Sequence, residues 1–257
     1  MGSKPSEKRQ RPQPVVKKPR TIAFVSALPG EGKTTVASTA AHILRRRRAA
    51  VGVMIPIALG CRRERTRLVS PDAEVLAHHA EAPEDLATIS PAGRTDNAPP
   101  YRKDDKGAGG VNLDEILSCY ETIRQRSRIV LIELHGGLLL PIAPGVDQAS
   151  LLEQMGAEVV VVGSSSADAF NQVMMTIDCV KSRNLSIAGV ALNRYDPDRA
   201  TSADEMNPEW IELFGRVDLP TMIPVGKNHS VDPPHLDRNL IEAVKPMVSG
   251  WLNKGVD

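Results

Sequence analysis

The sequence contains no hydrophobic run close to the roughly 20 residues that a membrane-spanning helix needs. Its first 20 residues also lack the apolar stretch of a secretory signal. We therefore expect a cytoplasmic protein that does not enter a membrane. Cysteine is scarce, because only Cys61, Cys119 and Cys179 are present and no two of them form a CxxC pair. This argues against a disulfide framework and a cysteine-based zinc site, and it predicts reduced thiols.

A strong overall charge is also missing, because the 257 residues carry a formal net charge of +1. The charge is unevenly distributed, however. Residues 1–20 hold seven basic side chains and one acidic one, whereas the remaining chain has 25 basic and 30 acidic residues. Four prolines keep the basic segment from forming a helix, so we predict a disordered tail over 1–20 and one folded domain over 21–257.

The alternatives for this tail are a nucleic-acid-binding arm and a targeting peptide. A second basic run, Arg45–Arg48, follows a helical segment, where the helix dipole favours cations. Since the rest of the chain is net acidic, we do not expect nucleic acid as a partner.

From Thr21 onward, short runs of apolar residues alternate with longer segments of helical periodicity, which is the pattern of βαβ units. The runs are continuous rather than alternating, as in parallel strands covered on both faces. We predict an α/β fold with a single doubly wound, mostly parallel sheet and helices on both faces. Expected strands are 21–26, 50–57, 128–133, 158–162, 186–192 and 220–223, and expected helices lie around 36–44, 113–123, 170–180 and 240–251.

Residues 60–111 interrupt this pattern with prolines and glycines, so we expect loops there and one short helix around 72–79. Irregular insertions of this length are more often functional than idle.

The clearest chemical signal is the run Pro29-Gly30-Glu31-Gly32-Lys33-Thr34-Thr35 between the first strand and the first helix. Glycines allow backbone N–H groups to surround a phosphate, and the helix amino terminus adds partial positive charge. A lysine here reaches the outer phosphates, and the next hydroxyl holds Mg²⁺. Ala27 occupies the position that usually holds the first glycine of this motif. We predict a phosphate loop that binds a nucleoside triphosphate.

A magnesium nucleotide also needs carboxylates, and two are candidates. Glu133 ends a buried strand, at the carboxyl edge where α/β sheets bind ligands. The glycines after it suit close approach to a substrate, and they equally suit a plain tight turn. Asp72 follows Ser70-Pro71 and is either a metal ligand or a helix N-cap.

In order and spacing, the motifs resemble those of the dethiobiotin synthetases, which are ATP-dependent ring-closing carboxylases of biotin synthesis. The similarity covers roughly residues 21–225. In that family the phosphate loop is followed by Lys-Pro-x-x-x-Gly, Ser-Asp-Ala, Glu-Gly-x-Gly-Gly-x-x-x-Pro and Asn-x-x-x-Pro. This sequence has matching segments at 55–60, at Asp72-Ala73, at 133–141, and at Asn193 with Pro197.

The resemblance implies a P-loop fold of the dethiobiotin synthetase type, a cytoplasmic homodimer, and an ATP- and Mg²⁺-dependent cyclo-ligase. Its substrates would be CO₂ and a vicinal diamine. Lys33 and Thr34 would be catalytic, and Gly136, Gly137 and Asn171 would bind substrate. The implied metal ligands are Thr34, Asp72 and Glu133, and the implied nucleotide contacts are Gly30, Glu31, Gly32, Lys33, Thr34, Thr35 and, on the adenine, Asn193.

Departures from the family pattern fall on the substrate side. Ile55 stands where the family has the lysine that neutralises the carbamate and the transferred phosphate. Leu59 stands where it has a hydroxyl residue before Gly60, and Leu28 where it has the aspartate of the phosphate loop. A replacement cation could come from Arg62 or Arg63, although solvated loop arginines are the simpler interpretation.

Two alternatives therefore stay open beside the ligase. One is a nucleotide-binding paralogue that has lost catalysis. The other is a partition-type switch ATPase, which Leu28 disfavours because those proteins carry a lysine at that position.

Overall fold

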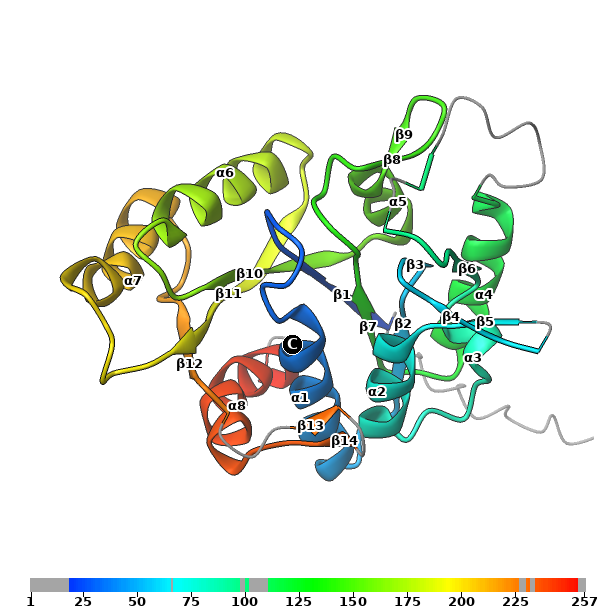
Figure 1. Ribbon diagram of the computed structural model, residues 1–257, viewed down its shortest axis with the longest axis horizontal. Helices are drawn as coiled ribbons and strands as arrows, with labels where there is room; N and C mark the ends of the chain where they lie inside the picture. The colour runs from blue at the N-terminus through cyan, green and yellow to red at the C-terminus, as the bar shows by residue number, and fades with distance from the viewer. Residues whose placement is uncertain are drawn as a thin grey trace, which may run out of the picture.

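The computed structural model describes residues 19–65, 67–97, 100–101, 111–226, 230–231 and 234–253. Its centre is a six-stranded sheet in the order β12-β11-β10-β1-β7-β2, in which all neighbouring strands are parallel (Figure 1). These strands are β1 (Arg20–Val25), β2 (Val51–Met54), β7 (Ile129–Glu133), β10 (Glu158–Ser164), β11 (Ser186–Tyr195) and β12 (Thr221–Pro224). The predicted parallel α/β sheet is confirmed.

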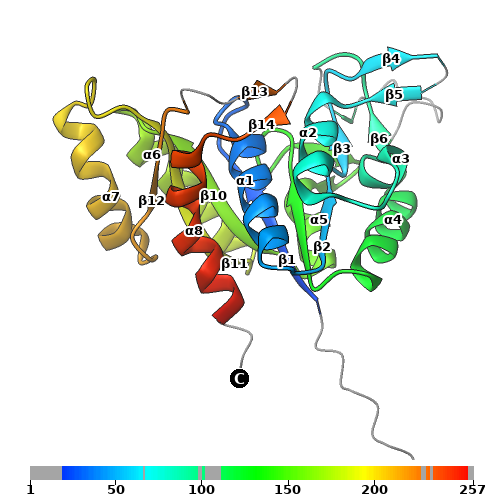
Figure 2. The same ribbon diagram turned by 90° about the horizontal axis from the view of Figure 1, so that it is seen from below.

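Helices cover both faces of this sheet (Figure 2). Side chains alternate along each strand, so Ile22 and Phe24 of β1 pack into one core cluster while Ala23 and Val25 pack into the other. The first cluster lies under α1 (Lys33–Arg46), α2 (Pro71–Ala80) and α8 (Arg238–Asn253). The second lies under α4 (Leu113–Gln125), α5 (Gln148–Met155), α6 (Ala169–Ser182) and α7 (Ser202–Gly215).

The expected strand over 50–57 is divided in two. After β2 ends at Met54, the N–H of Ile55 donates to the carbonyl of Ile89, which leads the chain away from the sheet (2.8 Å). A short strand, β3 (Ile57–Ala58), then pairs with β6 (Ala92–Gly93). Thus the end of β2 turns over the carboxyl edge of the sheet.

The segment expected to be mostly loops holds more structure than predicted. It contains a hairpin of β4 (Arg62–Glu64) and β5 (Arg67–Val69), then α2, and then the single turn α3 (Leu86–Ile89). The expected helix around 72–79 is α2. Smaller hairpins lie elsewhere, one of β8 (Pro141–Ala143) and β9 (Val146–Asp147) and one of β13 (Ser230–Val231) and β14 (Pro234–His235).

Helices α5 and α7 were not expected from the sequence. Helix α7 begins with a capping box between Thr201 and Asp204. Its large apolar residues Trp210, Leu213 and Phe214 are exposed, so they do not form the core-facing stripe that predicts a helix. The capping box was therefore the clearest local signal that the sequence offered for α7.

The predicted tail lies outside the described residues as far as position 18. Arg20, which we assigned to it, instead opens β1, and its guanidinium forms two hydrogen bonds with the Glu158 carboxylate (2.8 and 2.7 Å). In the described residues no helix has the length and hydrophobicity needed to cross a bilayer.

Helix α8 is anchored to the sheet through Trp251, which is 2% exposed. Its indole N–H donates to the carbonyl of Ala188 (3.0 Å), and its ring meets Phe24 edge-on at 6.2 Å between centroids. Arg20 also donates to the backbone carbonyl of Trp251. The last helix therefore closes the core above β1 and β11.

We predict that Trp251→Ala lowers the free energy of unfolding by about 3–5 kcal/mol, because it leaves a cavity in the core and removes the hydrogen bond to the Ala188 carbonyl. Trp210→Ala is the matched control, since that indole is 37% exposed; its loss should be about 1 kcal/mol. Urea denaturation followed by circular dichroism measures both. Equal losses would show that α8 does not depend on this contact.

Candidate functional site

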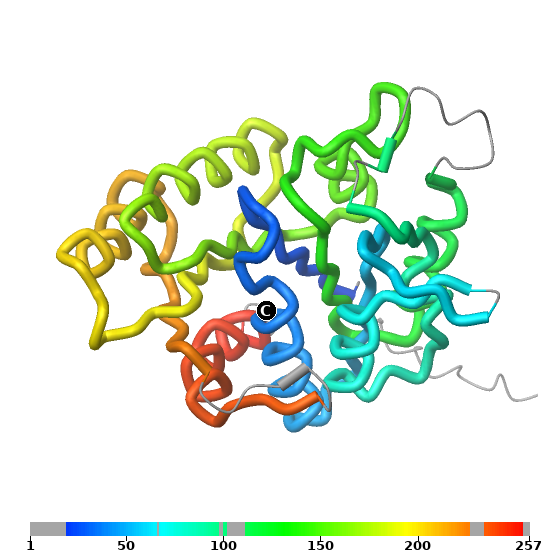
Figure 3. The backbone as a smooth tube through the Cα atoms, viewed as in Figure 1, coloured from blue at the N-terminus to red at the C-terminus, as the bar shows by residue number. Residues whose placement is uncertain are grey.

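The loop between β1 and α1 has the backbone shape of a phosphate-binding loop. Gly30 and Gly32 adopt φ values of +80° and +86°, which side-chain-bearing residues rarely adopt. At Gly32 there is a second constraint, because a Cβ atom there would lie 1.9 Å from Nδ2 of Asn193. In Figure 3 this segment lies near the middle of the molecule and leads directly into α1. The sequence needs glycine here for both conformation and packing.

Lys33, the first residue of α1, is 6% exposed. Its ammonium donates to the hydroxyl of Ser26 (2.7 Å), and this hydroxyl donates to the carbonyl of Leu28 (2.6 Å). Burial lowers the pKa of Lys33, while the charges of Glu133 and other nearby carboxylates oppose this shift. A buried cation thus lies at the loop, where the outer phosphates of a nucleotide would bind.

Glu133 ends β7, the strand beside β1, and is 6% exposed; its charge acts on this lysine. One carboxylate oxygen accepts a hydrogen bond from the hydroxyl of Thr34 (2.6 Å). The other, Oε2, is buried and has no hydrogen-bond partner in the described part of the chain. Burial and the charge of Asp72 raise the pKa of Glu133 to about 8, against the opposing effects of Thr34 and Lys33.

These features fit a divalent cation. An unpartnered buried oxygen and a carboxyl with a raised pKa both mark a place where positive charge is missing. Thr34, Asp72 and Glu133 offer the oxygen ligands that Mg²⁺ prefers. A bound cation would favour ionised Glu133 and satisfy its free oxygen.

Asp72 is the second residue of α2, and it is not the N-cap. Ser70 has that role, since its hydroxyl accepts from the N–H of Ala73 (3.2 Å). The helix-capping interpretation of Asp72 was therefore wrong. Its side chain remains available at a cavity that Glu133 also lines, and its charge acts on both Glu133 and Lys33.

The cavity has a volume of about 500 Å³. Its polar side consists of the phosphate loop with Thr34 and Thr35, together with Ser70, Asp72 and Glu133. Its apolar side consists of Ile55, Ala58, Leu59, Val75 and Leu134, and its outer end is formed by Asn193, Arg194, Pro224 and Val225. The cavity is therefore of a size suited to a nucleotide, with one charged wall and one hydrocarbon wall.

The apolar side is where the family's lysine would lie. Ile55 and Leu59 are 3% and 7% exposed and bring no charge. Arg62 does not replace the missing cation, because it binds Glu64 (2.8 Å) and Glu74 (2.6 Å) outside the cavity. Arg63 is exposed and does not line the cavity either. The interpretation of these two as surface arginines agrees with the structure.

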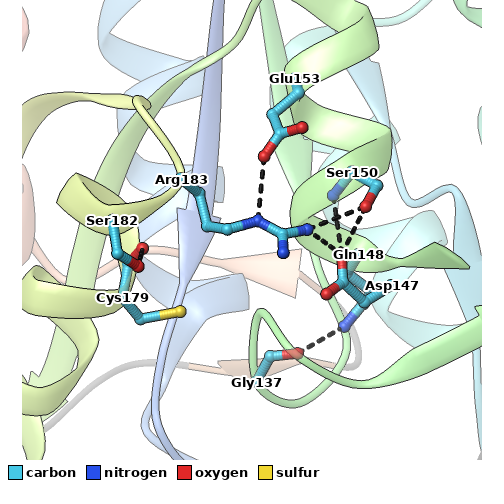
Figure 4. A network of polar contacts seen from close by, with 8 residues as sticks. All are labelled: Gly137, Asp147, Gln148, Ser150, Glu153, Cys179, Ser182 and Arg183. Carbon is cyan, nitrogen blue, oxygen red and sulfur yellow. Dashed lines mark hydrogen bonds and ion pairs between the residues drawn. The ribbon is translucent and has the colours of Figure 1, made fainter. Parts of the chain in front are cut away.

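The turn after Glu133 is held from behind by Gln148, the first residue of α5. Its side-chain amide, 1% exposed, donates to the carbonyls of His135 (2.7 Å) and Gly137 (2.9 Å). Figure 4 shows this contact to Gly137 together with the neighbouring hydrogen bonds around Arg183. The turn places the His135 imidazole in the cavity wall, where burial and the charge of Lys33 lower its pKa.

Behind Gln148, Arg183 connects α6 to α5 (Figure 4). Its guanidinium donates to Asp147 (2.6 Å), to Ser150 (2.8 Å) and to Glu153 (3.0 Å). Asp147 is also the N-cap of α5, since it accepts from the N–H of Ser150 (2.9 Å). The turn that borders the cavity thus depends on a polar network that continues to the surface.

The structure brings most of the candidate residues together. Gly30, Gly32, Lys33, Thr34, Thr35, Asp72, Glu133, Gly136 and Asn193 all line the cavity. Glu31 points away from it and accepts from the N–H of Ser164. Gly137 lies one residue beyond the lining, where a Cβ atom would be 3.5 Å from the Ala27 carbonyl oxygen. Asn171 lies on the exposed side of α6, outside the cavity lining.

Asn193 is buried, and its amide donates to the carbonyl of Glu31 (3.1 Å). It therefore supports the phosphate loop in addition to facing the outer end of the cavity. Ser26, Ser70, His135, Gln148 and Arg194 were missed from the sequence. Only Ser70 carried a signal, the Ser-Pro pair that often opens a helix.

The raised pKa of Glu133 predicts a pH dependence. A carboxyl whose pKa is higher in the folded state than in the unfolded state stabilises the fold at low pH. This stabilisation is lost as the pH rises from the unfolded-state pKa to the folded-state pKa of about 8. Without Mg²⁺, the free energy of unfolding of the wild type should therefore fall between pH 5 and 8, by up to about 1.4 kcal/mol per pH unit. Glu133→Gln should remove this fall.

Urea denaturation in EDTA at several pH values measures both proteins. Added Mg²⁺ should restore the stability of the wild type at pH 8 and leave Glu133→Gln unchanged. Parallel pH profiles for the two proteins would contradict the assignment of a proton-binding Glu133.

Comparison with known proteins identifies the family of this chain. A family model described as an AAA domain matches residues 20–234. The ATP-dependent dethiobiotin synthetase of Nitrosospira multiformis is 26% identical over 202 residues, which is 78% of this chain and 86% of the relative. That of Aromatoleum aromaticum is 27% identical over 213 residues, 81% of this chain and 91% of the relative.

Among solved structures, the septum site-determining protein MinD complexed with Mg-ADP from Pyrococcus horikoshii superposes with a TM-score of 0.54. The two are 17% identical, and the match covers 92% of this chain and 97% of that protein. At this identity the likeness shows the fold alone. From the family match and the curated relatives together, the chain belongs to the AAA-domain family of P-loop proteins, as a diverged relative of the dethiobiotin synthetases.

Proposed function

We propose that this protein is an ATP- and Mg²⁺-dependent cyclo-ligase of the dethiobiotin synthetase type. It would close a cyclic urea from a vicinal diamine and CO₂. The observation that carries the proposal is the buried Glu133 carboxylate, which is bonded to Thr34 and keeps one oxygen without a partner among the described residues. Such a group beside a buried lysine suits phosphoryl transfer, in which catalysis is mostly positioning and charge stabilisation.

In this proposal the nucleotide phosphates lie against the backbone of Gly30, Glu31 and Gly32 and against the ammonium of Lys33. Thr34 and Thr35 supply hydroxyls at the start of α1, and Asn193 borders the base. Thr34, Asp72 and Glu133 would hold Mg²⁺, which supplies neutralising charge for the phosphate oxygens when it is bound.

The reaction begins when CO₂ adds to one amine to give a carbamate. The carbamate oxygen attacks the γ-phosphate of ATP, which forms a carbamic-phosphoric anhydride and releases ADP. The second amine then attacks the carbonyl carbon, which closes the ring and expels phosphate. Lys33 stabilises the transferred phosphoryl group throughout, and Gly136 and Gly137 let the backbone approach the diamine.

The substrate-side role of Asn171 requires a second copy of the chain. Within one chain this side chain lies on the exposed face of α6, next to Met175, which is 65% exposed. We therefore include a homodimer in the proposal, in which this face approaches the partner's cavity.

The second candidate function is a nucleotide-binding paralogue without ligase activity. It is favoured by the hydrocarbon wall of Ile55 and Leu59 at the position where a cation would stabilise the carbamate. Loss of one preorganised charge donor costs on the order of 10²–10³ in rate. A partition-type switch ATPase is a weaker candidate, because the exposed Leu28 replaces its signature lysine.

Lys33→Ala should weaken binding of Mg·ATP roughly 100-fold or more, because the phosphates lose a buried cation. Lys245→Ala is the matched control, since that lysine is exposed on α8 and pairs with Glu242. Isothermal titration calorimetry measures both, with thermal unfolding as the check on folding. Equal affinities of wild type and Lys33→Ala would exclude the phosphate-loop assignment.

Ile55→Lys should raise cyclic urea formation from diaminopelargonate at least tenfold, about 1.4 kcal/mol of transition-state stabilisation, because an ammonium returns beside the carbamate. Ile55→Met is the control that changes shape without charge. Phosphate and cyclic urea are both quantified.

Two other results distinguish the candidates. If neither the wild type nor Ile55→Lys forms a cyclic urea while both bind ATP, the paralogue is the better description. If the wild type is fully active and Ile55→Lys is harmful, another group has taken the place of the lysine.

A further inference from the structure

Arginines gather at the amino-terminal edge of the sheet, opposite the cavity. Arg46 and Arg48 lie at the end of α1, and Arg126 and Arg128 lie between α4 and β7; all four are exposed. They are neighbours because β2 and β7 pair directly, with the N–H of Arg128 donating to the carbonyl of Ala50 (2.8 Å). We call these four residues the arginine edge.

Nearby arginines are neutralised, and the arginine edge is not. Arg45 pairs with Glu81 (2.6 Å), Arg124 with Glu121 (2.7 Å) and Arg20 with Glu158 (2.7 Å). Across the described ranges of the chain, no ion pair is found for any residue of the arginine edge. These acidic residues form their ion pairs with other arginines, although the charge of Arg46 also acts on Glu81. The four residues of the arginine edge are exposed to solvent.

Helix dipoles account for only part of this cluster. The dipole favours cations within the last turn of a helix. Arg46 is in the last turn of α1, and Arg126 is the C-cap of α4. Arg48 follows the C-cap of α1 with φ +58°, and Arg128 is two residues beyond the C-cap of α4. Two of the four cations thus have no helix-stabilising role.

The first strand of the sheet begins at the same place. The N–H of Arg20 donates to the carbonyl of Arg128 (3.1 Å), so the chain enters β1 beside the arginine edge. Figure 2 shows that β1 starts at the edge where α1 ends. Residues 1–18 carry six basic side chains and one acidic one, while the rest of the chain is net acidic. The arginine edge is therefore a local positive patch on a domain that is net acidic overall.

The net acidic charge of the chain after the tail argued against nucleic acid as a partner, but the local cluster of arginines reverses that expectation. We propose that the arginine edge binds the phosphodiester backbone of a nucleic acid, independent of sequence. Guanidinium groups bind phosphate oxygens bidentately, which makes arginine well suited to this backbone. A lipid surface is less suitable, because stable anchoring to a membrane combines basic residues with an apolar group that enters the bilayer. The exposed large apolar residues of the described chain lie on other elements, such as α6 and α7.

The test uses the full-length protein and a fluorescein-labelled 20-base-pair DNA duplex, with binding followed by anisotropy between 50 and 200 mM salt. The triple variant Arg46→Glu/Arg126→Glu/Arg128→Glu should weaken binding at least tenfold. It should also reduce the slope of the logarithm of the binding constant against the logarithm of the salt concentration by about 2–3, because each phosphate contact contributes roughly 0.9 to that slope.

The matched control is Arg63→Glu/Arg65→Glu/Arg199→Glu, three exposed arginines away from the arginine edge. It changes the net charge equally and should keep the wild-type affinity within about threefold. Thermal unfolding verifies that the variants are folded. Arginine-to-glutamine versions of both triples provide the same comparison if the glutamate variant of the arginine edge does not fold.

Three outcomes would overturn the proposal. Equal losses in the two triple variants would mean that only net charge matters. Full binding by the variant of the arginine edge, with loss on Lys17→Gln/Lys18→Gln, would place the contact in the leader alone. Binding to phosphatidylserine vesicles without binding to the duplex would identify a lipid surface instead.

Discussion

The hydrogen bond from Thr34 to Glu133 is the contact on which the site depends, because it joins the phosphate loop to the strand next to it. It lies inside the protein, where an unsatisfied oxygen is costly, and it becomes a charge-assisted bond when Glu133 is ionised. The two residues come from adjacent parallel strands, β1 through its loop and β7 at its end. Sheet order therefore decides that the carboxylate meets the hydroxyl, and Lys33 lies one residue before the hydroxyl.

The parts of the site that the sequence predicts are local in the chain. The phosphate loop is one continuous motif, and Glu133 stands at the end of an obvious buried strand. Asp72 lines the cavity and stays a predicted metal ligand, but the capping role that the sequence also allowed it belongs to Ser70, two residues earlier. In each case a short stretch of sequence contains most of the physical information.

The parts that the sequence does not predict depend on contacts between distant segments. Asn193 packs against Gly32, and Gln148 holds the carbonyls of His135 and Gly137, yet no local pattern marks either pair. Helix α7 was missed for a different reason: its large apolar side chains stay exposed, so burial does not impose a helical period on them. Prediction from periodicity works only where periodicity reflects a buried face.

Gln148 has a mechanical consequence for the turn at the cavity. Its single amide group bonds two carbonyls of that turn, and its backbone opens α5, so the turn and the helix move as one body. A displacement of Gly136 by a bound molecule must either break these bonds, at roughly 1 kcal/mol net each, or carry α5 with it. Arg183 bonds α5 to the end of α6, so the same polar contacts connect the cavity turn to a second helix.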